Sequence, residues 1–220
     1  MAMTRTRYPE IEAYALTCMT DSAHDMEHVY RVLNYALNIA AHEEGIDVEM
    51  LAAACLLHDI GRPEQSADKR INHAVCGGEK AFVWLTAHGY TESFAASVRD
   101  CIRTHRYRSS DPPRSPEAKI LFDADKLEAC GATGIARTLL YKAQVNDPLY
   151  LISHDGEISD GTNDTSSSFF KEYKFKLENV YDKFYTRRGK ELASKRHAAA
   201  RDFYEALLAE VRECYSIKGD

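Results

Sequence analysis

The sequence predicts an all-α protein, and three observations support this fold class. Apolar residues recur at helical spacing through most of the 220 residues. No segment shows the alternation of apolar and polar residues that marks a half-buried strand. Capping residues precede several of the periodic segments, and glycine or proline follows them, as at the ends of helices. We therefore expect a helical bundle with additional helices at its C-terminal end.

The first long helix is expected to run to about Glu44. Asp21 or Ser22 can cap its beginning, and Gly45 follows it in the usual helix-stop position. One face of this helix is apolar and contains Val32, Tyr35 and Ile39.

The next helix is the most apolar segment of the chain. Asp47 can cap it, and its sequence VEMLAAACLLHDIG is apolar nearly all round. A helix of this kind belongs in the middle of a protein. Gly61 and Pro63 are expected to close it.

Further helices are expected at about 72–88, 92–105, 116–126, 166–187 and 189–215. Thr91 and Ser115 are suitable caps for two of them. The polar segments 106–115 and 153–168 are expected to be loops. In the C-terminal part we expect a core of apolar residues at helical spacing, namely Phe169, Tyr173, Leu177, Val180, Phe184, Leu192, Phe203, Leu207 and Val211.

We expect residues 1–220 to form a single helical domain, with a metal-binding core at about 20–140 and a C-terminal helical extension at about 165–215. No apolar run approaches the roughly 20 residues of a membrane span, and the segment MAMTRTRYPEIEAY lacks the apolar stretch of a signal peptide. The six cysteines are scattered without a C-x-x-C pair, which is typical of reduced thiols. These features predict a cytoplasmic protein.

The formal net charge is −6 and the sequence pI is about 5.9. Binding to duplex nucleic acid requires a basic surface, so we do not expect that partner. A small phosphorylated substrate remains compatible with this charge, because a bound metal ion can supply local positive charge. The sequence leaves the oligomeric state open, a homodimer included.

His58 and Asp59 stand at the C-terminal end of the apolar helix. Adjacent side chains on a helix point about 100° apart, so both can approach one ion only where the helix ends against a cavity. A buried aspartate is costly unless it is paired or bound to a cation. The alternative is that Asp59 caps a neighbouring helix and His58 bonds a backbone carbonyl.

His28 and Asp125 complete a candidate ligand set. His28 lies on the apolar stripe of the first long helix, and Asp125 follows an apolar run. Their competitors are His24, one turn before His28, and Asp123, two residues before Asp125. Two imidazoles and two carboxylates suit a divalent ion such as Mn²⁺, Fe²⁺, Co²⁺, Ni²⁺, Zn²⁺ or Mg²⁺.

The segments HDMEHVYRV, AACLLHDIG and FDADKLEACGATGIAR together resemble the HD superfamily of metal-dependent phosphohydrolases, in particular its small stand-alone members. The resemblance is strong over about residues 20–140. It implies an all-helical fold, a divalent metal cofactor and hydrolysis of a phosphate ester or anhydride, as in a nucleotide. By position, His28, His58, Asp59 and Asp125 match the metal ligands of the family.

The resemblance also singles out His73 and His105, which hold a second ion in two-metal members of the family or contact substrate phosphate in one-metal members. Together with Arg31 and Lys126, they are our candidates for contacts with phosphate oxygens. An acidic residue often follows the HD pair by three positions, but here that residue is Arg62. The general base is therefore unassigned. The alternative function is a non-catalytic HD domain that senses nucleotides or binds a protein.

Overall fold

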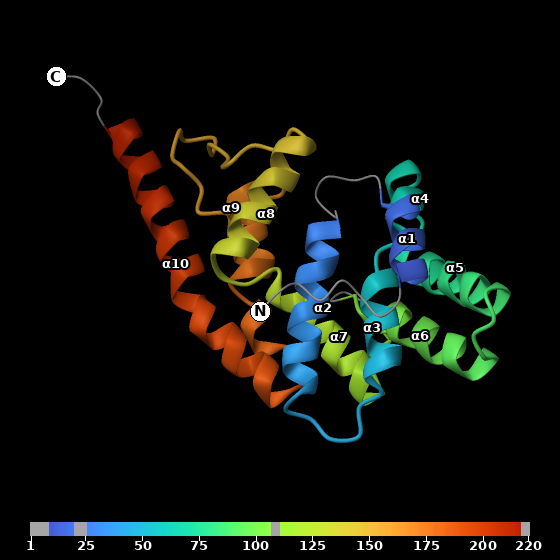
Figure 1. Cartoon of the computed structure of the whole chain (residues 1–220). Coiled ribbons are helices and arrows are strands. Elements are labelled where there is room, and N and C mark those ends of the chain that lie inside the picture. The colour runs from blue at the N-terminus through green and yellow to red at the C-terminus, as the bar shows by residue number, and fades with distance from the viewer. Residues whose placement is uncertain (1–8, 20–25, 107–110, 217–220) are drawn as a thin grey trace. The chain divides into compact units, whose positions relative to one another are not determined.

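The computed structural model describes residues 9–19, 26–106 and 111–216. Within these ranges the regular structure is helical, apart from one isolated antiparallel bridge between Ile152 and Ile158, so the predicted all-α class is confirmed (Figure 1). The chain divides into two compact units, Met1–Asp125 and Lys126–Asp220. The expected single domain stays a prediction, and each unit is described by itself.

The first unit contains most of the helices. They are α1 (Pro9–Cys18), α2 (Met26–Ala40), α3 (Val48–Leu57), α4 (Arg62–Ala67), α5 (His73–Ala87), α6 (Glu92–Thr104) and α7 (Pro116–Leu127), whose last two residues belong to the second unit. Thr91 caps α6 as predicted, and Ser115 accepts a hydrogen bond from the amide of Ala118 in the first turn of α7.

The apolar helix α3 is the centre of the first unit. Every residue from Met50 to Leu57 is buried, and α3 packs against α1, α2, α5 and α6. Asp47 caps it by accepting a hydrogen bond from the amide of Met50 at 3.0 Å. The helix ends with His58 as its C-cap. The predicted central position and cap are thus confirmed, and the HD pair lies at a buried helix end.

Two predicted boundaries were wrong, namely the end of the first long helix and the helix stop at Pro63. Helix α2 ends at Ala40 rather than Glu44, because the chain leaves the helix through a turn in which the amide of His42 bonds the carbonyl of Ile39. Gly45, with φ +70°, follows that turn. The candidate caps Asp21 and Ser22 lie outside the described residues.

Pro63 begins a helix instead of ending one. It lies in the first turn of α4, where its missing N–H costs nothing and its fixed φ favours the helix. Gly61, before α4, passes close to the first turn of α5: a Cβ atom added at Gly61 would lie 2.3 Å from the carbonyl oxygen of His73 and 2.7 Å from the amide nitrogen of Gly77. This close approach places the first residues of α5 next to the residues that follow His58 and Asp59.

The second unit contains α8 (Gly131–Gln144), α9 (Phe169–Glu172) and α10 (Arg187–Ser216). The helix expected at 166–187 is interrupted: α9 continues into a π-helical turn at Tyr173–Leu177 and a 3₁₀ turn at Val180–Asp182. The helices α1, α4 and α8 were not predicted.

An aromatic core holds the second unit together. Tyr173 stacks on Tyr204 with ring centroids 3.9 Å apart, and the expected core residues Phe169, Tyr173, Leu177, Val180 and Phe184 are buried. Phe203, also expected in the core, is instead 41% exposed, because the buried face of α10 is carried by Ala193, Ala200 and Tyr204.

The segment between α8 and α9 is irregular, as predicted for 153–168. Its ends are tied together by one buried lysine: Lys142 donates to Asp147 at 2.9 Å and to Ser167 at 2.7 Å. All six cysteines are free. Among the described helices, none is both long and apolar enough to cross a lipid bilayer.

Gly61→Ala is expected to destabilise the first unit, since the added methyl group would meet backbone atoms that cannot move alone. We expect a loss of about 1–3 kcal/mol in the free energy of unfolding, measured by urea denaturation. Gly78→Ala is the milder comparison, because the nearest backbone atom to its added Cβ, the carbonyl oxygen of Arg99, would lie 3.1 Å away rather than 2.3 Å. Equal effects of the two substitutions would contradict the close-approach argument.

Candidate metal centre

The candidate site is assembled from helix ends and one helix face in the first unit. His28 lies on α2, and Asp125 lies near the end of α7. His58 and Asp59 follow α3, His73 is the first residue of α5, and His105 is the C-cap of α6. The structure therefore brings together side chains that are far apart in the sequence.

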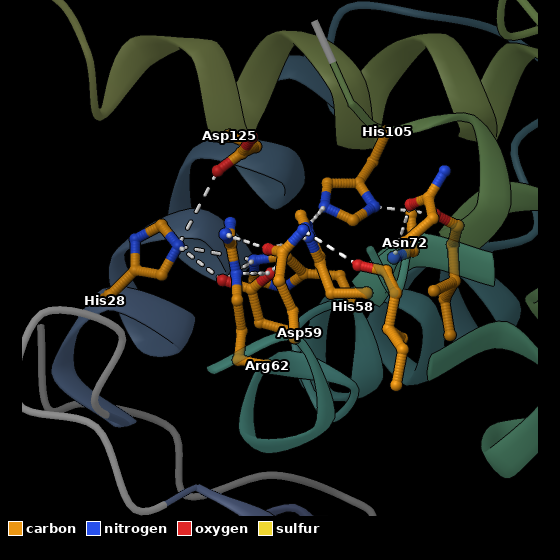
Figure 2. A network of polar contacts seen from close by, with 12 residues as sticks. His28, His58, Asp59, Arg62, Asn72, His105 and Asp125 are labelled. Atoms are coloured by element: carbon orange, nitrogen blue, oxygen red, sulfur yellow. Dashed lines mark hydrogen bonds and ion pairs between the residues drawn. The ribbon is translucent and has the colours of Figure 1, made fainter. Parts of the chain in front are cut away.

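Four side chains form the first of two groups, which we call group 1. The Nε2 atoms of His28 and His58 lie 3.3 Å apart. Asp59 Oδ2 is 3.6 Å from the first nitrogen and 3.5 Å from the second. Figure 2 shows Asp125 reaching toward His28 from the opposite side, with its Oδ1 3.6 Å from His28 Nε2. His28, His58 and Asp125 present ligand atoms close enough to share one ion.

Asp59 also belongs to a second group, which we call group 2. Its other oxygen, Oδ1, lies 3.5 Å from His73 Nε2 and 3.6 Å from His105 Nε2. Those two nitrogens are 3.3 Å apart. Asp59, His73 and His105 are all buried, and they could also share one ion. The carboxylate of Asp59 thus lies between two pairs of imidazoles.

In three of the imidazole rings, a hydrogen bond at Nδ1 determines that Nε2 is the nitrogen with the lone pair. The Nδ1 atoms of His58 and His105 lie 2.7 Å and 2.6 Å from the carbonyl oxygens of Cys55 and Ile102. His73 Nδ1 lies 2.8 Å from the side-chain oxygen of Gln65. Because these oxygens only accept hydrogen bonds, each Nδ1 carries the proton, and in the neutral ring each Nε2 offers a lone pair.

The convergent atoms fit a cation. In group 2, two Nε2 lone pairs and Asp59 Oδ1 face one another, and none of them can donate a hydrogen bond to another. In group 1, the buried Asp59 Oδ2 has no hydrogen-bond partner. A buried carboxylate oxygen without a donor is costly, and a divalent ion held by imidazole and carboxylate ligands would satisfy it.

Arg62 offsets part of the cost of burying the Asp59 carboxylate. Its Nε donates to Asp59 Oδ1 at 2.8 Å. Burial alone would raise the pKa of Asp59, but the Arg62 guanidinium and the surrounding imidazoles hold that pKa well below its ordinary value. Asp59 is therefore ionised at neutral pH, as a metal ligand must be.

The rings of His58 and His73 are neutral at the same pH. Burial lowers the pKa of His58 to about 4 and that of His73 to about 2, although the Asp59 carboxylate opposes both shifts. Neutral imidazole is the form that binds metal ions. At pH 7 the rings of His58 and His73 therefore offer Nε2 lone pairs beside the ionised carboxylate of Asp59.

The structure separates the candidates that competed in the sequence. Asp125 belongs to group 1, whereas Asp123 is buried and belongs to neither group. His24 lies outside the described residues. Glu64, the acidic residue that stands two positions after Arg62 and could have replaced the missing base, is 2.7 Å from Lys80 and forms an ion pair with it.

The four candidates for phosphate contacts lie in different settings. Arg31 follows His28 by one turn of α2 and lies 3.8 Å from Glu27. Lys126 is buried and belongs to the second unit. His73 and His105 are in group 2. The ligand and phosphate-binding roles of all these residues stay predictions.

Sequence reasoning missed the roles of two polar residues on α4. From the sequence, Arg62 is distinguished only because it occupies a position that is often acidic. Gln65 is not a candidate for any functional role. No local pattern distinguishes Gln65 from a solvated helix residue, because its partner His73 is reached only through the fold.

Comparison with known proteins agrees with this geometry. The family model for the HD domain matches residues 25–130 of the sequence. A predicted HD superfamily hydrolase from an uncultured Thermotogales bacterium is 31% identical in sequence, with 91% of this chain and 88% of that chain covered and a TM-score of 0.59. The chain therefore belongs to the HD superfamily, and it carries the buried histidine and aspartate groups typical of an HD metal site.

Two further relatives span nearly the whole chain. The Bacillus subtilis protein YpgQ is 26% identical over 204 residues, covering 92% of each chain. Its crystal structure in complex with ADP is similar in fold, with a TM-score of 0.72 at 24% identity, and covers 93% of this chain and 98% of that chain. A Lactobacillus plantarum protein gives a TM-score of 0.73 at 27% identity, covering 94% and 97%.

The pKa values of His58 and His73 predict how the metal-free protein responds to acid. Both values in the folded protein lie below the ordinary value of 6.5, so the unfolded chain takes up protons first. The free energy of unfolding should be highest above pH 6.5 and should fall between about pH 6.5 and 4.5, by at most about 3 kcal/mol per pH unit for two protons. Urea denaturation at a series of pH values measures this slope.

His58→Gln serves as the comparison for the acid response. With one of the two shifted groups removed, the slope between pH 6.5 and 4.5 should fall to about half. A stability that does not change across this interval in the unsubstituted protein would contradict the neutral, buried state of these imidazoles.

Proposed function

We propose that this protein is a metal-dependent phosphohydrolase that cleaves a phosphate ester or anhydride of a nucleotide. The observation that carries the proposal is the buried carboxylate of Asp59, whose two oxygens each face a pair of imidazole nitrogens. In a protein of the HD superfamily, this arrangement favours cation binding and hydrolysis.

His28, His58, Asp59 and Asp125 would hold a divalent ion in group 1. Asp59, His73 and His105 have the donor set for a second ion in group 2. When bound, such an ion would neutralise the charge that develops on the transferred phosphoryl group and act as a Lewis acid. The mixed nitrogen and oxygen ligands suit Mn²⁺, Fe²⁺, Co²⁺, Ni²⁺ or Zn²⁺ better than a purely oxygen-binding ion such as Mg²⁺.

Asp125 marks the open side of group 1. Its side chain is 21% exposed, whereas the side chains of His28 and Asp59 are 1% and 0% exposed. Substrate and the attacking water therefore approach past Asp125. Its carboxylate can accept a hydrogen bond from that water and orient a lone pair of the water toward phosphorus.

The neutral imidazole of His73 does not suit direct phosphate binding. A phosphate oxygen accepts hydrogen bonds, and the Nε2 atom of His73 is an acceptor as well, because its Nδ1 carries the proton. Direct contact with phosphate would first require protonation, which burial opposes at His73. This favours the cation-binding role of His73 over the phosphate-contacting role.

The nucleotide substrate class is supported by the complex of the relative YpgQ with ADP. A diphosphate carries oxygens that a divalent ion and a guanidinium can both bind. Arg31, one turn after His28 on α2, is our candidate for the guanidinium. Lys126 remains a candidate for a second phosphate contact.

The alternative, a non-catalytic module, would not require the complete ligand set. Every member of the predicted set is present, and His28, His58 and Asp125 converge. A degenerate scaffold could replace them with apolar residues at a gain in stability. The intact set therefore favours the enzyme.

Asp59→Ala should abolish both metal retention and hydrolysis, because it removes the carboxylate shared by the two groups. We expect at least about a 100-fold loss in phosphate or pyrophosphate release. The measurement is metal content after purification, together with product release from Mn²⁺-loaded protein over a panel of nucleotides, dinucleotides and simple phosphate esters.

Asp100→Ala is the matched control, since Asp100 is an exposed aspartate on α6 with its side chain 69% exposed. It should leave metal content and hydrolysis unchanged. If Asp59→Ala retains both properties, the proposed function fails. If Asp59→Ala loses metal but no substrate of the panel is cleaved by the unsubstituted protein, the non-catalytic alternative is favoured.

Arg31→Gln should weaken substrate binding without affecting the metal. Loss of one hydrogen bond to a charged group costs about 1.5–3 kcal/mol, which corresponds to an increase of about 10- to 100-fold in KM. Steady-state kinetics with the best nucleotide, with metal content measured in parallel, tests this role. An unchanged KM would contradict a phosphate contact by Arg31.

A further inference from the structure

We propose that Gln65 is a positioning residue that fixes the tautomer of His73 and so keeps the Nε2 lone pair of His73 directed into group 2. The inference rests on the proposed function, because it concerns how group 2 is prepared for a cation. It assigns a role to α4, the short helix that follows the HD pair.

The side-chain amide of Gln65 has only one orientation that satisfies its neighbours. Its Nε2 donates to the backbone carbonyl of Ile71 at 3.0 Å. A carbonyl oxygen cannot donate, so the amide nitrogen must face Ile71 and Oε1 must face the opposite way. Oε1 then lies 2.8 Å from His73 Nδ1.

This orientation determines the proton position on His73. Since Gln65 Oε1 only accepts hydrogen bonds, His73 Nδ1 must carry the proton. In the neutral ring Nε2 is then bare, and it lies 3.5 Å from Asp59 Oδ1 and 3.3 Å from His105 Nε2. The opposite tautomer would place a hydrogen atom where the shared cation would bind.

His73 needs an acceptor from another element because of its place in the helix. His58 and His105 are C-caps of α3 and α6, and each donates to a carbonyl three residues earlier in its own helix. The last carbonyls of a helix lack partners within the helix and are free to accept. His73 is the first residue of α5, where free amides rather than free carbonyls are found.

Gln65 is also connected to the shared carboxylate. Arg62, three residues earlier on α4, donates from Nε to Asp59 Oδ1 at 2.8 Å. Its Nη1 lies 3.4 Å from Gln65 Oε1. Helix α4 therefore contacts two of the three members of group 2 from one face, with Arg62 at Asp59 and Gln65 at His73. Second-shell contacts of this kind typically affect metal affinity by 10- to 100-fold.

The tautomer can be observed directly by nuclear magnetic resonance of the ¹⁵N-labelled full chain, metal-free and at pH 8. In the unsubstituted protein, His73 should carry its proton on Nδ1. In Gln65→Met, which preserves the length of the side chain but removes the acceptor, the population of the Nε2–H tautomer of His73 should increase. Gln65→Glu retains an oxygen acceptor and should restore the original tautomer.

Two controls isolate the effect. His58 and His105 donate to backbone carbonyls, so their Nδ1–H tautomers should persist in every Gln65 variant. Gln144→Met makes the same side-chain change on α8, in the second unit, and should leave the tautomer of His73 unchanged.

Calorimetric titration with Mn²⁺ provides the second measurement. Gln65→Met should weaken the Mn²⁺ site of group 2 by about 10- to 100-fold and leave the site of group 1 unchanged. Gln65→Glu should bind Mn²⁺ at least as tightly as the unsubstituted protein. A purely structural role would instead weaken both sites together.

The inference is overturned if His73 carries its proton on Nε2 in the unsubstituted protein, a result that needs no variant. It is also overturned if Gln65→Met changes neither the tautomer nor Mn²⁺ binding. These outcomes leave the proposed function standing. Conversely, if Asp59→Ala retains metal and hydrolysis, the proposed function fails, whatever the tautomer of His73.

Discussion

The structure of the first unit depends on one buried carboxylate, that of Asp59. Removing an ionised carboxylate from water is expensive, and the apolar helix α3 that delivers it provides no compensation. Compensation comes from elsewhere: the Arg62 guanidinium donates to Oδ1, and imidazole nitrogens surround both oxygens. Oδ2 is still left without a hydrogen bond. A divalent ion would remove this remaining deficit, so the cost of burying Asp59 supports the proposed metal site.

The imidazoles are supplied at helix ends, and the polarity of each end determines how its histidine is prepared. At the C-terminal ends of α3 and α6, backbone carbonyls of the last turn accept hydrogen bonds from the Nδ1 atoms of His58 and His105. At the N-terminal end of α5 no such carbonyl exists, and the side chain of Gln65 takes its place for His73. One backbone rule, that the two ends of a helix expose opposite groups, thus explains both the common Nδ1–H tautomer of the three rings and the need for the side chain of Gln65 at His73.

The charge of the site also bears on the proposed binding of a phosphorylated substrate. At neutral pH Asp59 is ionised and His58 and His73 are neutral, and the chain as a whole carries a net charge of −6. Such a site would repel a phosphate unless cations were bound. In the proposed function, metal binding would therefore precede phosphate binding, because bound ions would supply the positive charge that attracts an anion. Guanidinium groups such as that of Arg31 would then add geometric selectivity.

The sequence by itself determined the all-α class, the central position of α3, the caps at Asp47 and Thr91, and the candidate ligands around the HD pair. These features are local: they depend on periodicity, on capping chemistry and on residue types at short spacing. Tertiary structure alone decided where α2 ends, why Pro63 starts a helix, which residues of α10 are buried, and that Asp59 is shared by two groups. It also decided that Gln65 meets His73. Such features depend on which helix ends converge in space, and the packing of several helices around α3 sets that convergence.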